Sequence, residues 1–285
     1  MAAPELPKFD LVVATVDRSA ALNRLLASLK RQTYRSFRVL VADQNEDDRV
    51  EDVLRSHGSL DIVHVRAARG LSRGRNAALV DIDADVVAFP DDDCVYADDL
   101  LERVARRFAA NSSLDGLTGR EADDQGKSPP SWARDAATLT RENLWNRAIS
   151  FTLFLRRPLV ARVGRFDERL GLGAETRWSS GEEIDYLVRA LDAGARIDYD
   201  PGLIVTHASK KTAPDSLRAL GARDGASIGY ILRKHGYPSR TVVRMLIRPL
   251  GGACVALARR DRAGAGFHLA TLRGRLHGYH AKAVQ

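Results

Sequence analysis

The sequence predicts an α/β fold with a doubly wound, mainly parallel sheet, and two observations support this prediction. Apolar runs of strand length alternate with short amphipathic segments over the first 110 residues, which is the pattern of successive βα units. The run 86–90 is apolar throughout, as expected of a strand buried on both faces, and Pro90 fits only its end. Three carboxylates, Asp91 to Asp93, follow at once. Ligands of open α/β sheets bind at the carboxyl ends of the strands, so we expect the functional site there.

The remaining elements follow from periodicity. We expect strands at residues 9–16, 37–42 and 62–65, and helices at 19–31, 49–57, 76–81 and 98–110, with Ser19 as the N-cap of the first helix. Residues 111–142 are mostly loop with one or two strands, followed by a strand-like run at 149–155 and a helix at 158–163. A Gly-rich loop at 171–181 precedes a helix from Glu182 to about Ala193, which Gly194 ends. Strands at 197–199 and 203–205 lead into His207.

The positive charge lies at the C-terminal end. The 285 residues carry a net charge of +7, and residues 231–285 contain eleven Lys and Arg against one acid, Asp261, so the first 230 residues are slightly negative. This distribution argues against nucleic-acid binding by the main domain. Residues 240–248 have the pattern of a basic amphipathic helix, which predicts peripheral contact with an anionic membrane. Packing on the main domain and a dimer contact are the alternatives, and the oligomeric state stays open.

The cysteines and the N-terminus bear on location. Cys94 and Cys254 lie far apart with no metal-ligand spacing, which fits a reducing compartment. No secretory signal is apparent at residues 1–10, and no run approaches the roughly 18 apolar residues that span a bilayer; the apolar stretch 250–258 is too short. We therefore expect a cytoplasmic protein, with contact at the inner face of the membrane through the basic tail.

The three adjacent acids indicate a cation site. Neighbouring carboxylates repel one another, and a hard divalent cation held by oxygen ligands relieves that repulsion. The alternative for an isolated Asp-Asp-Asp sequence is a solvated acidic turn.

A series of motifs in a fixed order resembles the family 2 glycosyltransferases of GT-A fold. The resemblance covers about residues 9–209, and each motif by itself is weak. The motifs in chain order are Thr15-Val16-Asp17-Arg18, Asp43, Gly70 with Arg75-Asn76, Phe89-Pro90-Asp91-Asp92-Asp93, Gly181-Glu182-Glu183-Ile184-Asp185, and His207.

The resemblance implies a domain organisation and a metal site. Residues 1–210 would form the GT-A domain, with a nucleotide-binding half at about 1–110 and an acceptor half at about 111–210, and residues 211–285 a basic helical extension. The Asp-x-Asp motif of the family would be Asp91 and Asp93, which would coordinate Mg²⁺ or Mn²⁺ at the donor diphosphate. His207 would be a third metal ligand, the alternative being a contact with the diphosphate.

The resemblance also implies a nucleotide-sugar site. Asp43 corresponds to the family's base-recognising Asp, although a turn cap is an alternative. Arg75 would pair with phosphate or base, the alternative being a solvated Arg. The residues expected to bind the nucleotide sugar are Thr15, Asp17, Arg18, Asp43, Gly70, Arg75, Asn76, Asp91 and Asp92.

Glu183 is the expected catalytic base. The family carries Glu-Asp where this chain has Glu182-Glu183, so the usual Asp is here one methylene longer. The positive end of the helix dipole keeps a carboxylate ionised, as suits a base that deprotonates an acceptor hydroxyl. Glu182 and Asp185 are second choices, and simple capping of the helix is the alternative. Trp178 would stack on the acceptor sugar, unless it is a buried aromatic.

Together these features predict a metal-dependent, inverting glycosyltransferase. It would move a sugar from a nucleoside diphosphate donor, a UDP-sugar by expectation, to a hydroxyl of a saccharide or lipid-linked acceptor in bacterial polysaccharide, glycolipid or cell-wall assembly. Three alternatives remain. A sugar-phosphate nucleotidyltransferase usually has a Gly-rich loop, which is missing after Val13. A catalytically silent nucleotide-sugar binding protein is suggested by Glu183 in place of Asp. A nucleic-acid-binding module would use the basic tail.

Overall fold

The computed structural model describes residues 5–207 and 213–281, which form two compact units. Unit 1 comprises Met1–Phe166 and Tyr186–Ser209, and unit 2 comprises Asp167–Asp185 and Lys210–Gln285. The chain therefore passes between the units three times: after Phe166, inside a helix after Asp185, and near residue 210. The predicted domain boundary at residue 210 lies outside the described residues.

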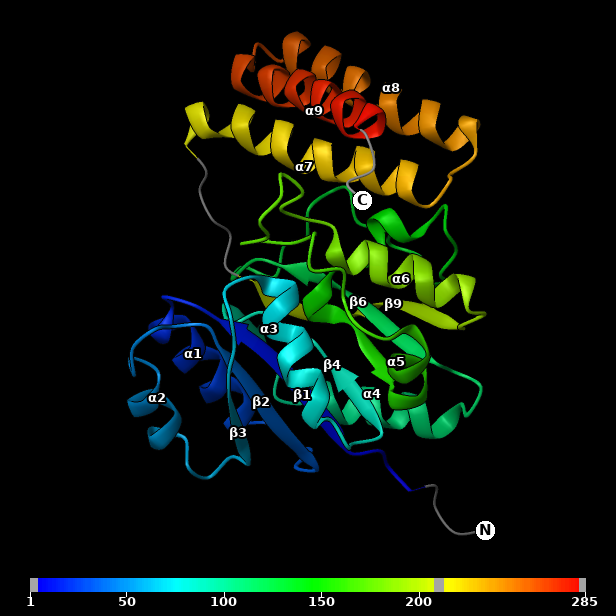
Figure 1. Cartoon of the computed structure of the whole chain (residues 1–285). Helices are drawn as coiled ribbons and strands as arrows, with labels where there is room; N and C mark the ends of the chain where they lie inside the picture. The colour runs from blue at the N-terminus through cyan, green and yellow to red at the C-terminus, as the bar shows by residue number, and fades with distance from the viewer. Residues whose placement is uncertain (1–4, 208–212, 282–285) are drawn as a thin grey trace. The chain divides into compact units, whose positions relative to one another are not determined.

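Unit 1 is built on a nine-stranded sheet with the order β3-β2-β1-β4-β8-β6-β9-β5, in which β7 pairs with β9 (Figure 1). Strands β3, β2, β1 and β4 run parallel to one another, and β6 runs parallel to β9. Strand β8, between β4 and β6, is antiparallel to both. The strand direction reverses between β4 and β8 and again between β8 and β6, so β1, β2, β4, β6 and β9 all end at the same edge of the sheet. The strands are β1 Phe9–Thr15, β2 Phe37–Asp43, β3 Ile62–Arg66, β4 Val86–Ala88, β5 Cys94–Tyr96, β6 Gly116–Ala122, β7 Ala137–Thr138, β8 Phe154–Arg156 and β9 Ile197–His207.

Helices cover both faces of this sheet. Alternate residues of β1, such as Leu11 and Val13, share a fully buried core with the leucines of α1 and the apolar face of α4. The next residue along, Ala14, faces the other way and lies close to Gly74 of α3. A mainly parallel sheet covered on both faces confirms the predicted α/β fold class. The helices that carry residues of unit 1 are α1 Ser19–Lys30, α2 Glu51–Ser56, α3 Leu71–Ala78, α4 Leu100–Ala110, α5 Arg157–Val163 and α6 Glu182–Asp192, with 3₁₀ turns η1 Leu79–Asp81, η2 Leu144–Asn146 and η3 Ser150–Thr152.

Several predicted element boundaries were wrong. The first helix begins at Ser19, so Arg18 is its N-cap, and no side-chain capping bond is formed there. Helix α3 begins at Leu71, before the predicted start at residue 76. Gly70 is its N-cap residue and has φ 125°, a conformation that glycine adopts without strain. The strand-like run 149–155 opens with the 3₁₀ turn η3 and pairs only from Phe154. Residues 197–205 belong to one strand, β9, and β5 was not predicted.

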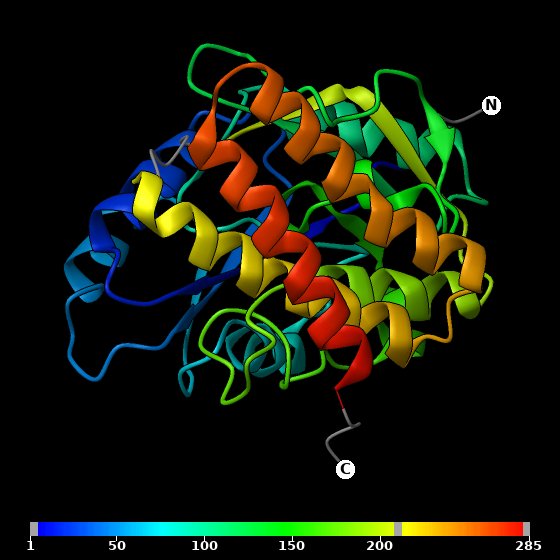
Figure 2. The ribbon, with the colours of Figure 1, turned by 90° about the horizontal axis from the view of Figure 1, so that it is seen from above.

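Unit 2 contains three long helices, α7 Pro214–Lys234, α8 Ser239–Ala258 and α9 Arg262–His280, which confirms the helical C-terminal region. Helix α9 packs against both α7 and α8 (Figure 2). Glycines make the contact with α7 close: a Cβ at Gly225 would lie 2.4 Å from the Thr271 carbonyl oxygen, and one at Gly278 would lie 2.0 Å from that of Ala226. A side chain at either glycine would therefore force the two helices apart.

From the sequence we expected that no segment could span a membrane, and helix α8 does not fit that expectation. By length and composition alone it is apolar enough to do so, and 33% of its apolar window is buried. Among the described helices it is the one that meets this criterion. Core helices of soluble proteins have the same properties, so this is weak evidence for a span.

Candidate functional site

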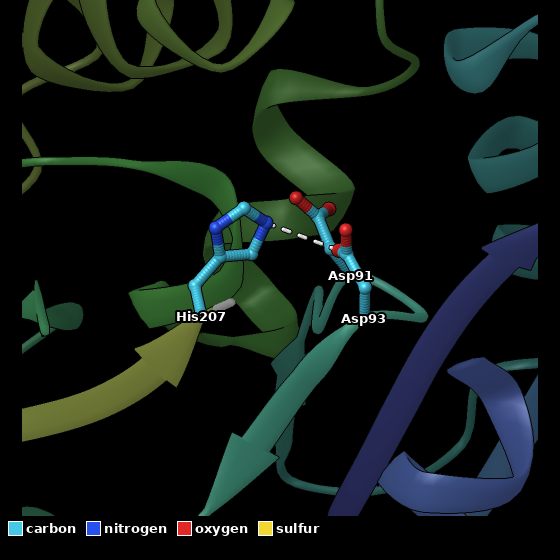
Figure 3. A group of neighbouring side chains, drawn as sticks. All are labelled: Asp91, Asp93 and His207. Carbon is cyan, nitrogen blue, oxygen red and sulfur yellow. Dashed lines mark hydrogen bonds and ion pairs between the residues drawn. The ribbon is translucent and has the colours of Figure 1, made fainter. Parts of the chain in front are cut away.

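Three potential metal ligands meet at the carboxyl edge of the sheet of unit 1 (Figure 3). Asp91 and Asp93 follow β4, and His207 ends β9. The chain turns back after the acids, so that Cys94 is the register partner of His207. One ligand atom from each of Asp91, Asp93 and His207 lies within 4.8 Å of the other two, and His207 Nε2 is 3.0 Å from Asp93 Oδ1.

The chemistry of these side chains fits a divalent cation. Carboxylate oxygens suit both Mg²⁺ and Mn²⁺, and an imidazole nitrogen is accepted more readily by Mn²⁺. Asp93 is buried, whereas Asp91 and His207 are partly exposed, so the group combines a fixed carboxylate with access from solvent. The predicted ligand set is thus brought together by the fold.

Two arginines neutralise the acids. Arg18 donates to Asp92 Oδ1 at 2.7 Å and also to Asp93 Oδ2. Arg75, whose side chain is 1% exposed, donates to Asp91 Oδ1 at 3.0 Å, and its guanidinium lies 5.4 Å from the centre of the Phe166 ring. Guanidinium groups that pair with carboxylates can also pair with a diphosphate, because both anions present negatively charged oxygen acceptors.

The middle acid is held in a different environment. Asp92 is 3% exposed and accepts a 2.7 Å hydrogen bond from Thr15 Oγ1 at the end of β1. Burial raises the pKa of Asp92 to about 6, although the Thr15 hydrogen bond and the Arg18 charge act in the opposite direction. The hydrogen bond to Asp93 raises the pKa of His207, against the effect of burial.

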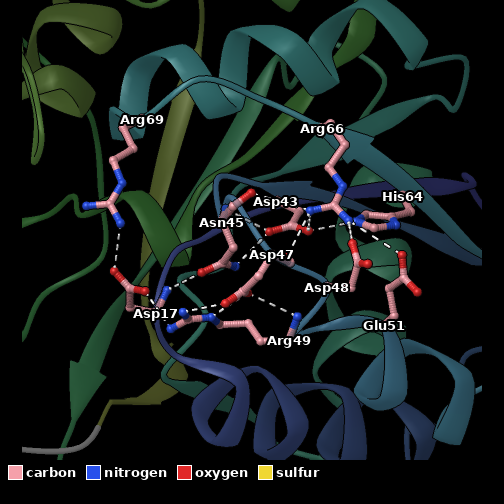
Figure 4. Close-up of polar contacts among 10 residues, drawn as sticks. All are labelled: Asp17, Asp43, Asn45, Asp47, Asp48, Arg49, Glu51, His64, Arg66 and Arg69. Atoms are coloured by element: carbon pink, nitrogen blue, oxygen red, sulfur yellow. Dashed lines mark hydrogen bonds and ion pairs between the residues drawn. The ribbon is translucent and has the colours of Figure 1, made fainter.

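A second polar cluster surrounds Asp43 at the end of β2 (Figure 4). Asp43 is fully buried, and Oδ1 accepts from the backbone N–H and the side-chain Nδ2 of Asn45 at 3.0 and 2.7 Å. Its Oδ2 lies 2.9 Å from His64 Nε2 and 3.0 Å from Arg66 Nη1. Burial opposes ionisation, but the hydrogen bonds from Asn45 and His64 outweigh it and hold the pKa of Asp43 below its ordinary value.

Asp17 borders this cluster in an unusual backbone conformation. It is one of two non-glycine residues with positive φ in the described chain, at 57°, and its N–H donates to Asn45 Oδ1 at 2.7 Å. Its carboxylate binds Arg49 at 2.6 Å and Arg69 at 3.0 Å. Left-handed non-glycine residues cost energy and persist where the surroundings hold them, which is common at ligand sites.

Gly70 and Asn76 have structural contacts. The Gly70 N–H donates to Gln44 Oε1 at 2.6 Å. The Asn76 amide donates to the Phe166 carbonyl at 3.0 Å and accepts from the Phe166 N–H at 2.8 Å. Both Asn76 side-chain atoms therefore bind backbone, and ligand binding by Asn76 stays a prediction.

The acidic motif of α6 separates into different environments. Gly181, with φ 84°, precedes the helix, and Glu182, Glu183 and Asp185 occupy its first turn. Asp185 is fully buried in unit 2, with an ion pair to Lys234 Nζ and a 2.8 Å contact with His235 Nε2. Glu182 is 5% exposed and Glu183 is partly exposed.

Trp178 is buried inside unit 2. It is 1% exposed and stacks on Tyr230 with ring centres 4.7 Å apart and an interplanar angle of 15°. The stacking partner is therefore another side chain, which favours the buried-aromatic alternative over acceptor stacking.

Sequence reasoning missed several residues of these clusters. His64 and Arg66 were not singled out, yet β3 is parallel to β2 with Asp43 opposite Arg66 and Val41 opposite His64. The alternation of polar residues along β3 was the available signal. Lys234 and His235 were counted only as part of a basic tail, and no local pattern indicated that they contact Asp185.

Comparison with known proteins identifies the family. The family model "Glycosyl transferase family 2" matches residues 10–165. The chain belongs to glycosyltransferase family 2. It is 26% identical over 274 residues to the pre-mycofactocin glycosyltransferase of Mycobacterium tuberculosis, covering 86% of this chain and 51% of that protein. It is also 27% identical over 203 residues to the succinoglycan biosynthesis protein ExoM of Rhizobium meliloti, covering 67% and 64%. The chain spans about half the length of the mycobacterial relative.

Solved structures share the fold of this family 2 chain. The mannosyltransferase PcManGT from Pyrobaculum calidifontis, in complex with GDP-Man and Mn²⁺, matches with a TM-score of 0.67 and 14% identity, covering 96% of this chain and 87% of that one. TarS residues 1–349 from S. aureus, in complex with UDP-GlcNAc, matches with a TM-score of 0.63 and 16% identity, covering 93% and 90%. The predicted GT-A fold and enzyme family are confirmed.

Proposed function

We propose that this protein is a metal-dependent, inverting glycosyltransferase that uses a nucleoside diphosphate sugar. The observation that carries the proposal is the convergence of Asp91, Asp93 and His207, with ligand atoms within 4.8 Å, beside Arg18 and Arg75. Carboxylates and cations placed together at the ligand edge of an α/β sheet suit a diphosphate bound with a cation.

Different residues of unit 1 would bind different parts of the donor. Asp91, Asp93 and His207 would hold Mg²⁺ or Mn²⁺, which when bound neutralises charge on the diphosphate leaving group. Arg18 and Arg75 are positioned to exchange a carboxylate contact for a phosphate contact.

The Asp43 cluster would recognise the nucleoside. In the described residues, the Asp43 carboxylate contacts Asn45, His64 and Arg66. A direct contact between Asp43 and the base therefore requires one of these partners to move, and Asp43 otherwise acts by positioning them. Thr15, Asp17 and Asp92 complete the expected nucleoside side of the site.

The acceptor hydroxyl needs a base. As its oxygen attacks the anomeric carbon from the side opposite the diphosphate, the new C–O bond forms while the bond to the diphosphate oxygen breaks, and a carboxylate accepts the proton. Glu183 is our choice for this role. Asp185 is committed to Lys234 and His235, whereas Glu183 is partly exposed at the N-terminus of α6, where the helix dipole favours the ionised form.

Glu183→Gln is expected to lower the transfer rate by about two to four orders of magnitude, because general-base catalysis contributes that much. The variant keeps size and hydrogen-bonding capacity, so nucleotide binding and stability should be unchanged. Steady-state transfer assays and nucleotide titration would measure both. Full activity of Glu183→Gln would refute the assignment, and stable donor binding without turnover by the wild type would identify a silent binding protein.

The remaining proposals concern substrates and organisation. Residues 1–210 would act as the transferase domain, with donor and acceptor halves at about 1–110 and 111–210, and residues 211–285 as its extension. We propose a UDP-sugar donor and a saccharide or lipid-linked acceptor in bacterial polysaccharide, glycolipid or cell-wall assembly. The name of the ExoM relative supports a polysaccharide pathway. The similar structures contain both UDP-GlcNAc and GDP-Man, so the base has to be measured.

A thermal-shift panel tests the donor site. UDP, GDP, dTDP and CDP are each combined with Mn²⁺, Mg²⁺ or EDTA. A ligand at about 100 times its Kd stabilises the protein by roughly 2.7 kcal/mol. We expect one nucleotide to stabilise the protein only with metal. Failure of every nucleotide to do so would overturn the proposed function.

Helix α8 supports a peripheral membrane contact of a cytoplasmic enzyme. An exposed apolar stripe with helical spacing runs along it, comprising Val243, Ile247, Leu250, Cys254 and Leu257. Arginines stand at both ends, Arg240, Arg244 and Arg248 before the uncharged stretch and Arg259, Arg260 and Arg262 after it. An apolar face between basic ends fits the interface of an anionic bilayer.

Vesicle binding tests this contact. The full chain should sediment with vesicles of phosphatidylcholine and phosphatidylglycerol but not of phosphatidylcholine alone, and Ile247→Asp with Leu257→Asp should weaken binding at least tenfold. Val80→Asp is the control, because Val80 is 80% exposed and belongs to unit 1. Equal sedimentation of both variants, or equal binding to neutral vesicles, would contradict the proposal.

A further inference from the structure

Unit 1 has a basic cavity that the donor site does not use. Its volume is about 370 Å³. It lies between the loop that follows β6 and the part of β9 where the register with β6 shifts, and its lining residues are Arg120, Lys127, Ser128, Pro129, Pro130, Trp132, Arg134 and Pro201. Three cations, one indole and three prolines give it a positive and partly apolar wall, with no carboxylate among the lining residues.

The cations of this cavity are not neutralised. The Arg120 guanidinium donates to the Pro201 carbonyl at 2.7 Å and to Ser128 Oγ at 2.8 Å, which orients it without balancing its charge. In the described part of the chain, the structure shows no ion pair for Lys127 or Arg134.

The acids next to the cavity bind other groups. Asp135 pairs with Arg147 at 2.9 Å, and Asp200 pairs with Arg107 at 3.3 Å. Asp123 Oδ1 accepts from the Lys127 backbone N–H at 2.8 Å, and Glu121 Oε1 accepts from Trp132 Nε1. In the described residues none of these acids forms an ion pair with the Lys127 or Arg134 side chain, so both cations can bind an anion from outside the protein.

The indole wall is fixed in place. Trp132 Nε1 donates to Glu121 Oε1 at 3.1 Å, and its ring stacks on Tyr199 with centres 6.4 Å apart and planes 18° apart. The Tyr199 hydroxyl in turn donates to the Ala133 carbonyl at 2.7 Å. Trp132 itself is half-buried, so part of the ring is exposed to the cavity. A rigid aromatic face of this kind suits the apolar face of a sugar ring.

The cavity adjoins the edge of the sheet that carries the candidate metal ligands. Ala122 at the end of β6 is the register partner of Thr206, the residue before His207. In the sheet, β6 is two strands from β4 and four from β2. These strand separations correspond to about 10 and 19 Å, so β6, which contributes Arg120 to the cavity, lies nearer to β4 and Asp91 than to β2 and the Asp43 cluster.

We propose that this cavity binds the acceptor and selects an anionic one, a saccharide that carries a phosphate or a carboxylate. The inference rests on the proposed function, because it assigns the second substrate of the same site. Arg120, Lys127 and Arg134 bind the anionic group, and Trp132 packs against the sugar ring. The acceptor hydroxyl is then directed toward the metal-binding edge.

Ligand-observed NMR titration of the full chain tests this, with UDP and diamagnetic Mg²⁺ present so that the donor site is filled. The probes are glucose 1-phosphate, glucuronate, glucose and inorganic phosphate. We expect both anionic sugars to bind and glucose to bind at least tenfold more weakly. The double variant Lys127→Gln/Arg134→Gln should lose at least tenfold affinity for the anionic sugars, and Trp132→Leu should weaken the sugars but not inorganic phosphate.

The control is Lys8→Gln/Arg24→Gln, which removes two exposed cations of unit 1 outside the cavity. It should bind like the wild type. Equal binding of glucose and the anionic sugars, or unchanged binding by Lys127→Gln/Arg134→Gln, would overturn the inference. UDP binding is measured in the same samples. If the wild type does not bind UDP, the donor site is refuted. If it binds UDP but no anionic sugar, only the acceptor cavity is refuted.

Discussion

Asp93→Asn is expected to lower the transfer rate by about a thousandfold or more and to abolish metal-dependent stabilisation by the nucleotide. Asp93 is buried, and its carboxylate contacts both His207 and Arg18. The amide keeps the shape of the side chain but removes the charge that a divalent cation requires. Loss of a preorganised electrostatic contact at a charged leaving group typically costs two to three orders of magnitude, and loss of a metal ligand adds to it. Transfer assays with Mn²⁺ and the thermal-shift panel would measure the two effects.

Asp98→Asn is the matched control for this substitution. Asp98 lies five residues further along the chain, its side chain is 56% exposed, and it pairs with Arg31 at 3.1 Å. An exposed pair of this kind contributes little, so activity and metal response should stay at wild-type values. Metal-dependent nucleotide binding by Asp93→Asn equal to that of the wild type would show that Asp93 is not a ligand.

Much of the fold of unit 1 was predictable because its signals are local. The apolar runs that became β1, β2 and β4 are bounded by polar residues, and the leucines of α1 share one face. Strand β5 was missed because its three residues follow the acids immediately and pair only with the distant β9. In the same way, the glycines of α7 and α9 have meaning only when the two helices face each other, since Gly225 and Thr271 lie far apart in the sequence.

The candidate site was predictable where the residues stand at strand ends. Asp91 and Asp93 could be placed at the ligand edge because they follow a buried strand, whereas His207 was added to them only by the resemblance to the family. The partners of Asp43 could not be identified by the same rule, because His64 and Arg66 lie along β3 and reach Asp43 sideways. Spacing also could not separate Glu183 from Asp185, which are two residues apart on one helix. Their environments differ because Lys234 and His235 come from another part of the chain.

Asp185→Ala is expected to destabilise the protein by about 3–5 kcal/mol. Asp185 is fully buried, and its carboxylate contacts Lys234 and His235, whose side chains are 23% and 8% exposed. Removing one partner of a buried ion pair is costly, because the remaining desolvated groups lose a compensating charge. Lys234 keeps a second acid, Asp167, at 2.7 Å, so the cost should fall mainly on the start of α6 and the end of α7. Denaturant unfolding would measure the loss.

The comparison with Asp192→Ala and Glu183→Gln separates a structural role of Asp185 from a catalytic one. Asp192 ends the same helix, is 47% exposed and pairs with Arg141 at 3.2 Å, so its loss should change stability by less than about 0.5 kcal/mol. Glu183→Gln should lose activity and keep stability, whereas Asp185→Ala should lose stability first. If Asp185→Ala instead unfolds like the wild type and loses only its rate, the buried pair is not structural, and Asp185 replaces Glu183 as the candidate base. The two carboxylates share one turn of α6, so only measurements of both stability and rate can assign their roles.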